Sequence, residues 1–224
     1  DVSWARDMVS FHIQEQGSGR LQKFVAIANS RNSSSKVEYT VVYRFNGEQF
    51  ELFQRLSTKG AMDIEHFIFG GAHHLIVGNH FEENGAGYGV ASMIYRYTWN
   101  GIENRNLFEP IQSISTNGAA ALKYFEIERR HFIVAANYFN GSHAAIDSSV
   151  YELERSNPDT IIPRISLVQS IPTNGARDVA CVSDNGRHLI AFANRYDSHV
   201  SVMMWSKQAD QFEPAGSLPC RFAV

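Results

Sequence analysis

The chain has 224 residues, 44% of them hydrophobic and 12% aromatic, and its formal net charge is −3 at pH 7. This length and apolar content are enough for one all-β domain with a buried core. The acidic balance and the lack of a Lys/Arg cluster argue against a nucleic-acid partner, because phosphate binding needs clustered basic side chains. The longest apolar runs are far shorter than a membrane span, so no membrane insertion is expected.

A segment of about 57 residues recurs along the chain, and a fixed period of this size is typical of a propeller or a solenoid. Each full copy carries the motif Gln-x-(Leu/Ile)-x-Thr-x-Gly-Ala, whose alanine is Ala61, Ala119 or Ala176, and Ala5 begins a partial copy. The four repeats are 5–60, 61–118, 119–175 and 176–224, and no linker divides them. The sequence therefore predicts one domain built from four equivalent units.

Each repeat contains four short runs rich in Val, Ile, Phe, Tyr and Thr and bounded by Gly, Asn or Pro, which is the signature of strands. In the second repeat these runs are Asp63–Phe69, His74–Gly78, Ala91–Thr98 and Leu107–Ile114. Four strands are the content of one propeller blade, so the predicted fold is an all-β propeller of four repeats with four antiparallel strands each. The composition of 119–130 favours a helix, but its equivalence to strands in the other repeats predicts a strand.

The ends of the chain fit a closed ring of four blades. The chain starts just after one Gln-x-Ile segment and finishes with its equivalent, Gly216–Leu218. If blades and repeats are offset, the C-terminal strand would complete the blade begun at the N-terminus and remove exposed sheet edges. The alternative is that two chains combine into a larger ring, which would make the protein a homo-oligomer.

Cysteines and glycosylation motifs bear on the compartment of the protein. Cys181 and Cys220 both lie in the last repeat, and two cysteines are too few for a disulfide framework. They predict either one bridge that ties down the C-terminal strand or a pair of buried thiols. Asn32 and Asn140 begin Asn-x-Ser motifs in loop-like surroundings, which indicate glycosylation and secretion.

The combined pattern resembles the epilepsy-associated repeat (EAR), also called the epitempin repeat (EPTP), over nearly all of the chain. It consists of Gln-x-Ile-x-Thr-x-Gly-Ala-x-Asp-(Ile/Val), then Phe-x-Ile, then (His/Phe)-Leu-(Ile/Val)-Val-(Ala/Gly)-Asn, then (Val/Ile)-Tyr-Arg-(Phe/Tyr). The repeat domain of leucine-rich glioma-inactivated proteins belongs to this family. The resemblance implies a secreted β-propeller that binds extracellular partners without catalysis. Familiar members use seven repeats and this chain has four, so ring size and partner do not follow.

One repeat position carries carboxylates. Asp7, Asp63 and Asp178 share it, and the third repeat has Ala121 there. If that strand lines a central channel, the carboxylates converge near the axis, where their oxygens suit Ca²⁺. The resemblance to the glioma-inactivated proteins implies a channel calcium site that includes Asp63 and Glu65. The alternative is that each Asp bonds to neighbouring backbone amides, and no cofactor is required.

Histidines also recur at the start of the second strand. His74, His131 and His188 are interpreted as solvent-exposed residues at this strand start and not as metal ligands.

An asparagine ends the second strand of every repeat, and a structural role in the turn explains an asparagine at this position well. The recurring asparagines are Asn29, Asn79, Asn137 and Asn194. Variable polar loops follow them, and such loops on a rigid scaffold usually carry binding. The predicted ligand-binding residues are His80, Phe81, Tyr88, Tyr138, Asn140, His143, Tyr196, Asp197 and His199.

These loop residues combine aromatic faces with amide and carboxylate groups, as a sugar ring requires. The same groups serve a protein interface. No Gly-x-Ser-x-Gly, His-Glu-x-x-His or phosphate-loop motif is present, so we expect no catalytic residues and no enzyme. We expect a secreted, extracellular, lectin-like protein that binds cell-surface glycans. The alternative is a ligand for a cell-surface glycoprotein receptor.

Overall fold

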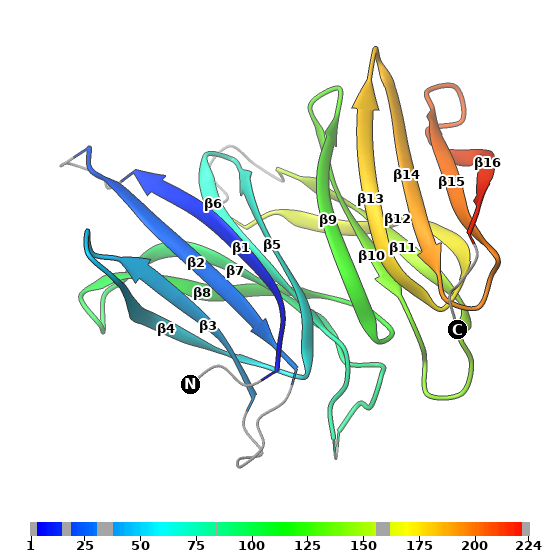
Figure 1. Ribbon diagram of the computed structural model, residues 1–224. Coiled ribbons are helices and arrows are strands. Elements are labelled where there is room, and N and C mark those ends of the chain that lie inside the picture. The colour runs from blue at the N-terminus through cyan, green and yellow to red at the C-terminus, as the bar shows by residue number, and fades with distance from the viewer. Residues whose placement is uncertain (1–3, 15–18, 31–37, 84, 156–161, 221–224) are drawn as a thin grey trace.

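The computed structural model describes residues 4–14, 19–30, 38–83, 85–155 and 162–220 (Figure 1). These residues form sixteen β-strands in four antiparallel sheets, and they contain no helix. Each sheet consists of four consecutive strands in chain order. The structure thus confirms the predicted all-β propeller of four repeats with four antiparallel strands per repeat. Because the described residues include no helix, none of them could cross a membrane as a helical span.

We number the sheets as blades 1 to 4. Blade 1 contains β1 (Ala5–Gln14), β2 (Leu21–Asn29), β3 (Glu38–Phe45) and β4 (Phe50–Thr58). Blade 2 contains β5 (Ala61–Phe69), β6 (Ala72–Asn79), β7 (Ser92–Asn100) and β8 (Arg105–Ile114). Blade 3 contains β9 (Ala119–Ile127), β10 (Arg130–Asn137), β11 (Ala145–Glu154) and β12 (Arg164–Asn174). Blade 4 contains β13 (Ala176–Asp184), β14 (Arg187–Asn194), β15 (His199–Ser206) and β16 (Gln211–Pro219).

Tight turns join the first two strands of blades 2, 3 and 4. Gly70–Gly71, Glu128–Arg129 and Asn185–Gly186 all have positive φ angles, between 48° and 78°. Positive φ at both residues is the backbone of a two-residue type I′ hairpin turn, which matches the twist of the flanking strands. The turn at 128–129 therefore makes the segment 119–130 part of a hairpin, as its repeat position predicted, despite its helix-favouring composition.

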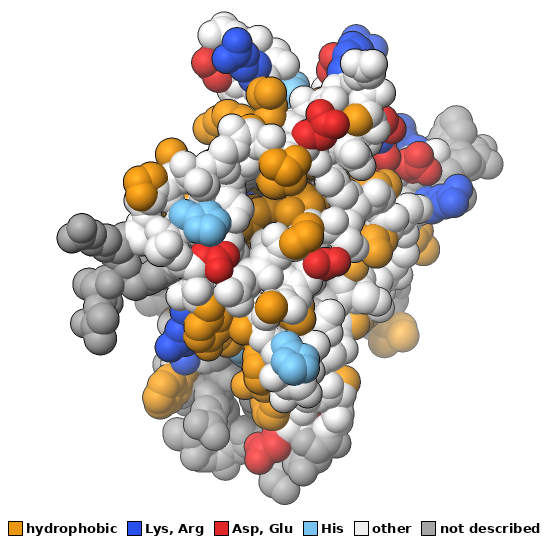
Figure 2. Space-filling view, turned by 90° about the vertical axis from the view of Figure 1, so that its right-hand side faces the viewer, with side chains coloured by type: hydrophobic (Ala, Val, Ile, Leu, Met, Phe, Trp, Pro, Cys, Tyr) orange, Lys and Arg blue, Asp and Glu red, His pale blue; other side chains and the backbone are white. Residues whose placement is uncertain are grey.

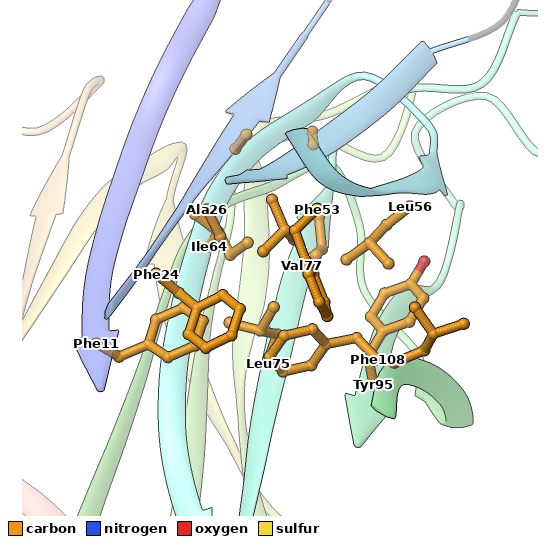
Figure 3. Close-up of a cluster of buried hydrophobic side chains, with 14 of the residues drawn as sticks. Phe11, Phe24, Ala26, Phe53, Leu56, Ile64, Leu75, Val77, Tyr95 and Phe108 are labelled. Carbon is orange, nitrogen blue, oxygen red and sulfur yellow. The ribbon is translucent and has the colours of Figure 1, made fainter. Parts of the chain in front are cut away.

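The core lies between consecutive blades. Three clusters of buried apolar side chains fill the spaces between blades 1 and 2, 2 and 3, and 3 and 4. In the first of these, Phe11 and Phe24 of blade 1 pack against Leu75, Val77 and Phe108 of blade 2 (Figure 3). The first strands β1, β5, β9 and β13 follow one another through the middle of the molecule, so each inner blade buries apolar side chains on both faces.

The outer faces of the two terminal blades carry exposed apolar side chains. Met8 on β1 is 66% exposed, whereas the equivalent Ile64 of blade 2 is 1% exposed. On the far side of blade 4, Val182 and Leu218 are 57% and 58% exposed, and Figure 2 shows hydrophobic side chains gathered at the centre of that side of the molecule. Blades 1 and 4 lie at opposite sides of the molecule (Figure 1), so the four blades form an open arc. The closed ring expected from the ends of the chain is therefore not formed by the described residues.

The C-terminal strand stays in its own blade. Strand β16 pairs with β15 from Ser206–Gln211 to His199–Pro219, and β1 to β4 form a complete sheet of consecutive strands. The expected completion of the N-terminal blade by the C-terminal strand is therefore wrong within the described chain. The reason is that blades and repeats coincide, so no strand is left over at either end.

A glutamine side chain fastens blade 1 to blade 2, and another fastens blade 3 to blade 4. The amide of Gln54 in blade 1 accepts from the backbone N–H of Phe108 at 2.9 Å and donates to its carbonyl at 3.0 Å. Gln169 in blade 3 makes the same pair of bonds with Phe212 of blade 4, at 2.8 and 2.7 Å. Gln112 occupies the equivalent position in blade 2 and has no such bond among the described residues.

The two cysteines are free thiols, so the predicted bridge between Cys181 and Cys220 is not formed. Cys181 lies on β13, at one edge of blade 4, and Cys220 follows β16 at the opposite edge. Three strand spacings separate these edges, about 14 Å, and a disulfide needs Cα atoms within about 7 Å. Burial raises the pKa of the Cys181 thiol to about 12, and Cys220 is exposed.

Replacing Gln169 by Leu should destabilise the protein by about 1–3 kcal/mol, because the N–H and C=O of Phe212 lose their partners. Gln112→Leu is the matched control, and we expect it to stay within about 0.5 kcal/mol of the wild type. Urea denaturation of the three proteins measures the difference. Equal effects of the two substitutions would show that the hydrogen-bond pair does not fasten blade 4.

His74 is fully buried in the core between blades 2 and 3. Its ring stacks on Phe67 at 5.0 Å, and its Nδ1 donates to the carbonyl of Ala72 at 3.0 Å. Burial lowers its pKa to about 4, because a charged ring would lose its hydration. The neutral ring therefore contributes stability that is fully present above the unfolded-state pKa of about 6.5 and is lost as the pH falls toward 4.

His74→Phe should flatten the loss of stability between pH 6.5 and 4. Phe24 and Phe132 occupy the equivalent position in blades 1 and 3, so a phenyl ring fits the packing while it cannot take up a proton. We expect stability at pH 7 to be unchanged within about 1 kcal/mol. Urea denaturation across this pH range is the measurement, with exposed His143→Gln as the control. If stability falls with pH as steeply in His74→Phe as in the wild type, burial of neutral His74 is not the cause of the loss.

Candidate functional site

Four buried asparagines fix the start of the loops that follow the second strand of each blade. In Asn79, Asn137 and Asn194, Oδ1 accepts from a backbone N–H of the preceding inter-blade connection at 2.9–3.2 Å. Nδ2 of Asn29, Asn79 and Asn137 donates to a carbonyl near the third strand at 2.8–2.9 Å. The structural role expected for these residues is thus present. We call this side the loop face; it carries residues 80–83, 85–91, 138–144 and 195–198 with the connections at 59–60, 115–118 and 175.

The glycine of the repeat motif lets loop and connection pack closely. Gly118 and Gly175 have φ angles of +55° and +65°, in the left-handed region. A Cβ on Gly175 would lie 2.6 Å from the ring of Tyr196, and one on Gly118 would lie 2.9 Å from the carbonyl oxygen of Phe139. Both positions therefore require glycine for backbone conformation and for space, and they bring the loop aromatics onto the connections.

The loop aromatics of blades 2, 3 and 4 form one continuous ladder. The ring of His80 stacks on Tyr138 at 5.8 Å, and Tyr138 stacks on Tyr196 at 6.3 Å. Tyr88 meets His80 edge-on at 5.4 Å and Phe139 edge-on at 4.9 Å. Burial lowers the pKa of His80, so its ring is neutral near pH 7. These five residues are called the ring ladder below.

Two arginines surround Tyr138 at the centre of the ring ladder. The guanidinium carbon of Arg177 lies 3.7 Å from the ring centroid, and Nη1 of Arg195 donates to the hydroxyl at 2.9 Å. The hydroxyls of Tyr138 and Tyr196 are 3.1 Å apart. Burial raises the pKa of Tyr138, but the bond with Tyr196 and the charge of Arg177 outweigh burial and lower it. The hydrogen bond to Tyr138 raises the pKa of Tyr196.

Beside the ladder lies a hollow of about 450 Å³. Arg6 of blade 1, Met62 of blade 2 and Arg177 of blade 4 line it, together with Trp4 and His80. Since three of these side chains come from the first strands of different blades, the hollow lies where those strands approach one another. It combines an apolar wall with two guanidinium groups and one carboxylate, that of Glu83. The two positive charges outnumber the negative one, a setting suited to an anionic group on an amphipathic ligand.

Five of the nine predicted ligand-binding residues come together here. They are His80, Phe81, Tyr88, Tyr138 and Tyr196, and Phe81 joins the others through its contact with Tyr88 at 4.8 Å. Three of the other four make local bonds or lie at a strand end. Asp197 accepts from Nδ2 of Asn174 at 2.9 Å, Asn140 accepts from the backbone of His143 at 2.8 Å, and His199 begins β15.

Sequence reasoning missed the arginines. Arg6, Met62 and Arg177 each directly follow the alanine that marks the repeat, so one repeat position supplies the walls of the hollow. A comparison of the residues after that alanine could have found them. Arg195 directly follows Asn194 and was within the loops considered. Its contact with Tyr138 of another blade has no signal in the local sequence.

The predicted glycosylation sites remain predictions. Asn140 is exposed at the start of a turn, where its Oδ1 accepts from the backbone N–H of Ser142 at 2.9 Å. Asn32 lies outside the described residues.

All four carboxylates predicted for calcium bond to protein groups. Asp63 accepts from the backbone N–H of Leu122 in the next blade at 2.8 Å, and Asp178 accepts from its own neighbour, Val179, at 2.8 Å. Asp7 likewise accepts from the N–H of Ile64 at 3.1 Å. Only Asp178 thus bonds to a neighbouring backbone amide, the alternative that the sequence allowed, whereas Asp7 and Asp63 bond to backbone amides of the next blade. Burial, and then the charge of Asp7, raise the pKa of Asp63 well above its usual range.

The fit of these residues to Ca²⁺ is poor. Glu65 is paired with Lys123 at 2.9 Å, and Ca²⁺ takes six to eight oxygen ligands. In the described part of the chain no three His, Cys, Asp or Glu side chains are grouped so as to hold a metal ion. The calcium site therefore stays an implication of the family resemblance, and we derive no chemistry from it.

The recurring histidines do not share one structural position. Counted back from the asparagine that ends the second strand, His73 is equivalent to His131 and His188, and His74 is equivalent to Phe132. The interpretation of His74 as a solvent-exposed strand start is wrong, because it is buried. The other three bond to side chains on the first strand of their own sheets, at 2.6–3.0 Å, so their rings do not converge.

Comparison with known proteins gives a consistent picture. A model of the EPTP domain matches residues 49–98 and 107–154. The thrombospondin-type laminin G domain and EAR repeat-containing proteins of Mus musculus and Homo sapiens are 38% and 35% identical to this chain over 130 residues. These residues are 57% of this chain and 18% of each relative, so the chain corresponds to a small part of the relatives' length.

A solved structure shares the fold. It is a 6-phosphogluconolactonase candidate from Bacteroides uniformis ATCC 8492, with a TM-score of 0.59 and 10% sequence identity. The superposition covers 93% of this chain and 54% of that chain, and at this identity the likeness concerns the fold alone. The repeat motif, the blade structure and the matched relatives together support membership of this chain in the EPTP, or EAR-repeat, family.

Proposed function

We propose that this chain is a non-catalytic protein-interaction module whose loop face binds an acidic segment of a partner protein. The supporting observation is the placement of Arg6, Arg177 and Arg195. Each guanidinium lies over an aromatic ring, at 5.7, 3.7 and 5.6 Å. None of the three forms an ion pair with a carboxylate among the described residues, so their charges are available to a ligand.

Arginine held against tyrosine and tryptophan is the chemistry of binding hot spots. These residue types are enriched at the centres of protein interfaces, where a guanidinium binds a carboxylate with two parallel hydrogen bonds. The aromatic rings fix each arginine in place, so little side-chain entropy is lost when a ligand binds. The hollow of about 450 Å³ beside Arg6 and Arg177 can take one or two side chains of an inserted segment.

Family membership supports a recognition role over a catalytic one. The curated relatives are described by their EAR repeats and laminin G domain. The lactonase candidate is 10% identical and shares the fold, which gives no basis for transferring an activity. An extracellular cell-surface partner, as the family resemblance implied, is part of this proposal.

A lectin-like role is the second candidate, since two aromatic rings on the loop face keep open surfaces. Tyr196 is 55% exposed and Phe81 is 39% exposed, and an exposed ring can stack on the CH face of a sugar. The ring of Tyr138, in contrast, is already covered by Arg177. The partner in this case would be a cell-surface glycan.

The double variant Arg177→Ala/Arg195→Ala should weaken the binding of acidic peptides. We expect the wild-type chain to bind a fluorescent Glu/Tyr-rich peptide with an affinity that falls as salt rises, and the variant to bind at least ten-fold more weakly. Fluorescence anisotropy measures both. Arg164→Ala, an exposed arginine at the start of β12, is the matched control and should bind normally.

A glycan array run with the same proteins separates the two candidates. Protein binding at the loop face predicts a silent array for neutral sugars. Array binding that is inhibited by free sugar and lost in Tyr196→Ala, with no peptide binding, would establish the lectin-like role and refute the first proposal.

A further inference from the structure

Two further hollows lie on the opposite side of the molecule, at blades 1 and 2. We call this side the turn face, because it carries the hairpin turns at 46–49, 70–71 and 101–104. One hollow, of about 510 Å³, lies between blades 1 and 2. The other, of about 460 Å³, lies along the end of blade 1. Gln22 lines both, so the two hollows adjoin and form one groove.

The groove is cationic although the chain has a net charge of −3. Arg20, Lys23 and Arg44 line the smaller hollow and Arg96 lines the larger one, and no Asp or Glu lines either. Lys23, Arg44 and Arg96 form no ion pair with any described residue. Burial lowers the pKa of Arg96 from its usual value, which reflects a guanidinium with reduced hydration that an anion would stabilise.

The larger hollow also offers the groups that bind sugars. Trp99 lines it and is 59% exposed, so its ring is open for stacking. Gln14, Gln22, Thr98 and Asn106 line it too, and their amides and hydroxyl can both donate to and accept from sugar hydroxyls. An aromatic platform, several amides and a guanidinium together suit a sugar that carries a negative charge.

Two polar atoms of this lining have no partner. Oε1 of Gln22 and Nε of Arg96 are buried and make no hydrogen bond with the described residues. Buried polar atoms are normally paired, and those that are not call for an explanation. Both side chains are only half-buried, so a small rotation would bring each atom to a ligand in the groove.

From these observations we propose that the turn-face groove binds an acidic oligosaccharide, with one charged sugar on Trp99 and Arg96 and the following sugars along Lys23 and Arg44. A saccharide chain fits better than a single small anion, because the cations extend over two adjoining hollows. It also fits better than an acidic peptide, because the amides and the open indole ring match hydroxyl groups and CH faces. This site is separate from the protein-binding loop face.

Isothermal titration with a heparin octasaccharide tests the proposal, with a chitin oligosaccharide of similar length as the neutral comparator. We expect the heparin fragment to bind with an affinity that falls as NaCl rises from 50 to 300 mM, and the neutral sugar not to bind. Arg96→Ala, Trp99→Ala and Lys23→Ala/Arg44→Ala should each weaken binding at least ten-fold. Arg96→Lys should recover part of it.

Arg187→Ala is the matched control, because Arg187 is exposed beside a hairpin turn of blade 4, outside the groove. It should leave affinity unchanged, and thermal melting of every variant confirms that the fold is kept. The proposal is overturned by a lack of heparin binding at 50 mM NaCl, or by equal weakening in Arg187→Ala and the groove variants. It is also overturned if Arg177→Ala/Arg195→Ala abolishes heparin binding while the groove variants do not.

Discussion

Face-to-face packing between consecutive blades is the constraint on which the rest of the structure depends. A single four-stranded sheet cannot bury its own apolar side chains, so each cluster of the core is shared by two blades. The contribution of the neighbour is visible where it is lacking: Met8 is 66% exposed on blade 1, and Ile64, its equivalent on blade 2, is 1% exposed. Hydrogen bonds such as Asp63 to the N–H of Leu122 then fix the height of one blade against the next.

This shared packing explains why the fold could be predicted from the sequence. Every copy of the repeat must bury the same side chains, so a strand in three copies required a strand in the fourth. That argument correctly outweighed the helix-favouring composition of Ala119–Ile127, which is β9. The structural role of the asparagine at the end of each second strand could also be predicted, because this role is local. The asparagine bonds to backbone groups that the same motif always places nearby.

Features that depend on the distance between residues across the molecule could not be predicted from the sequence. The sequence placed Cys181 and Cys220 in one repeat, but only the strand order shows that they lie at opposite edges of a sheet. It aligned His74 with His131, and a one-residue difference in spacing before the asparagine reverses the face of the sheet that each side chain occupies. The contact of Arg177 with Tyr138 joins two blades, and no spacing within a repeat encodes it.

The loop-face site is therefore a product of the blade packing, and not of any one loop. Arg6 and Arg177 line the same hollow although they belong to the first and last blades, at opposite ends of the open arc. Their separation is set by the three packed cores between β1, β5, β9 and β13. A change in any of those cores would alter the angle between blades and move the two guanidinium groups relative to each other. The turn-face groove involves only blades 1 and 2, so it depends on one core alone.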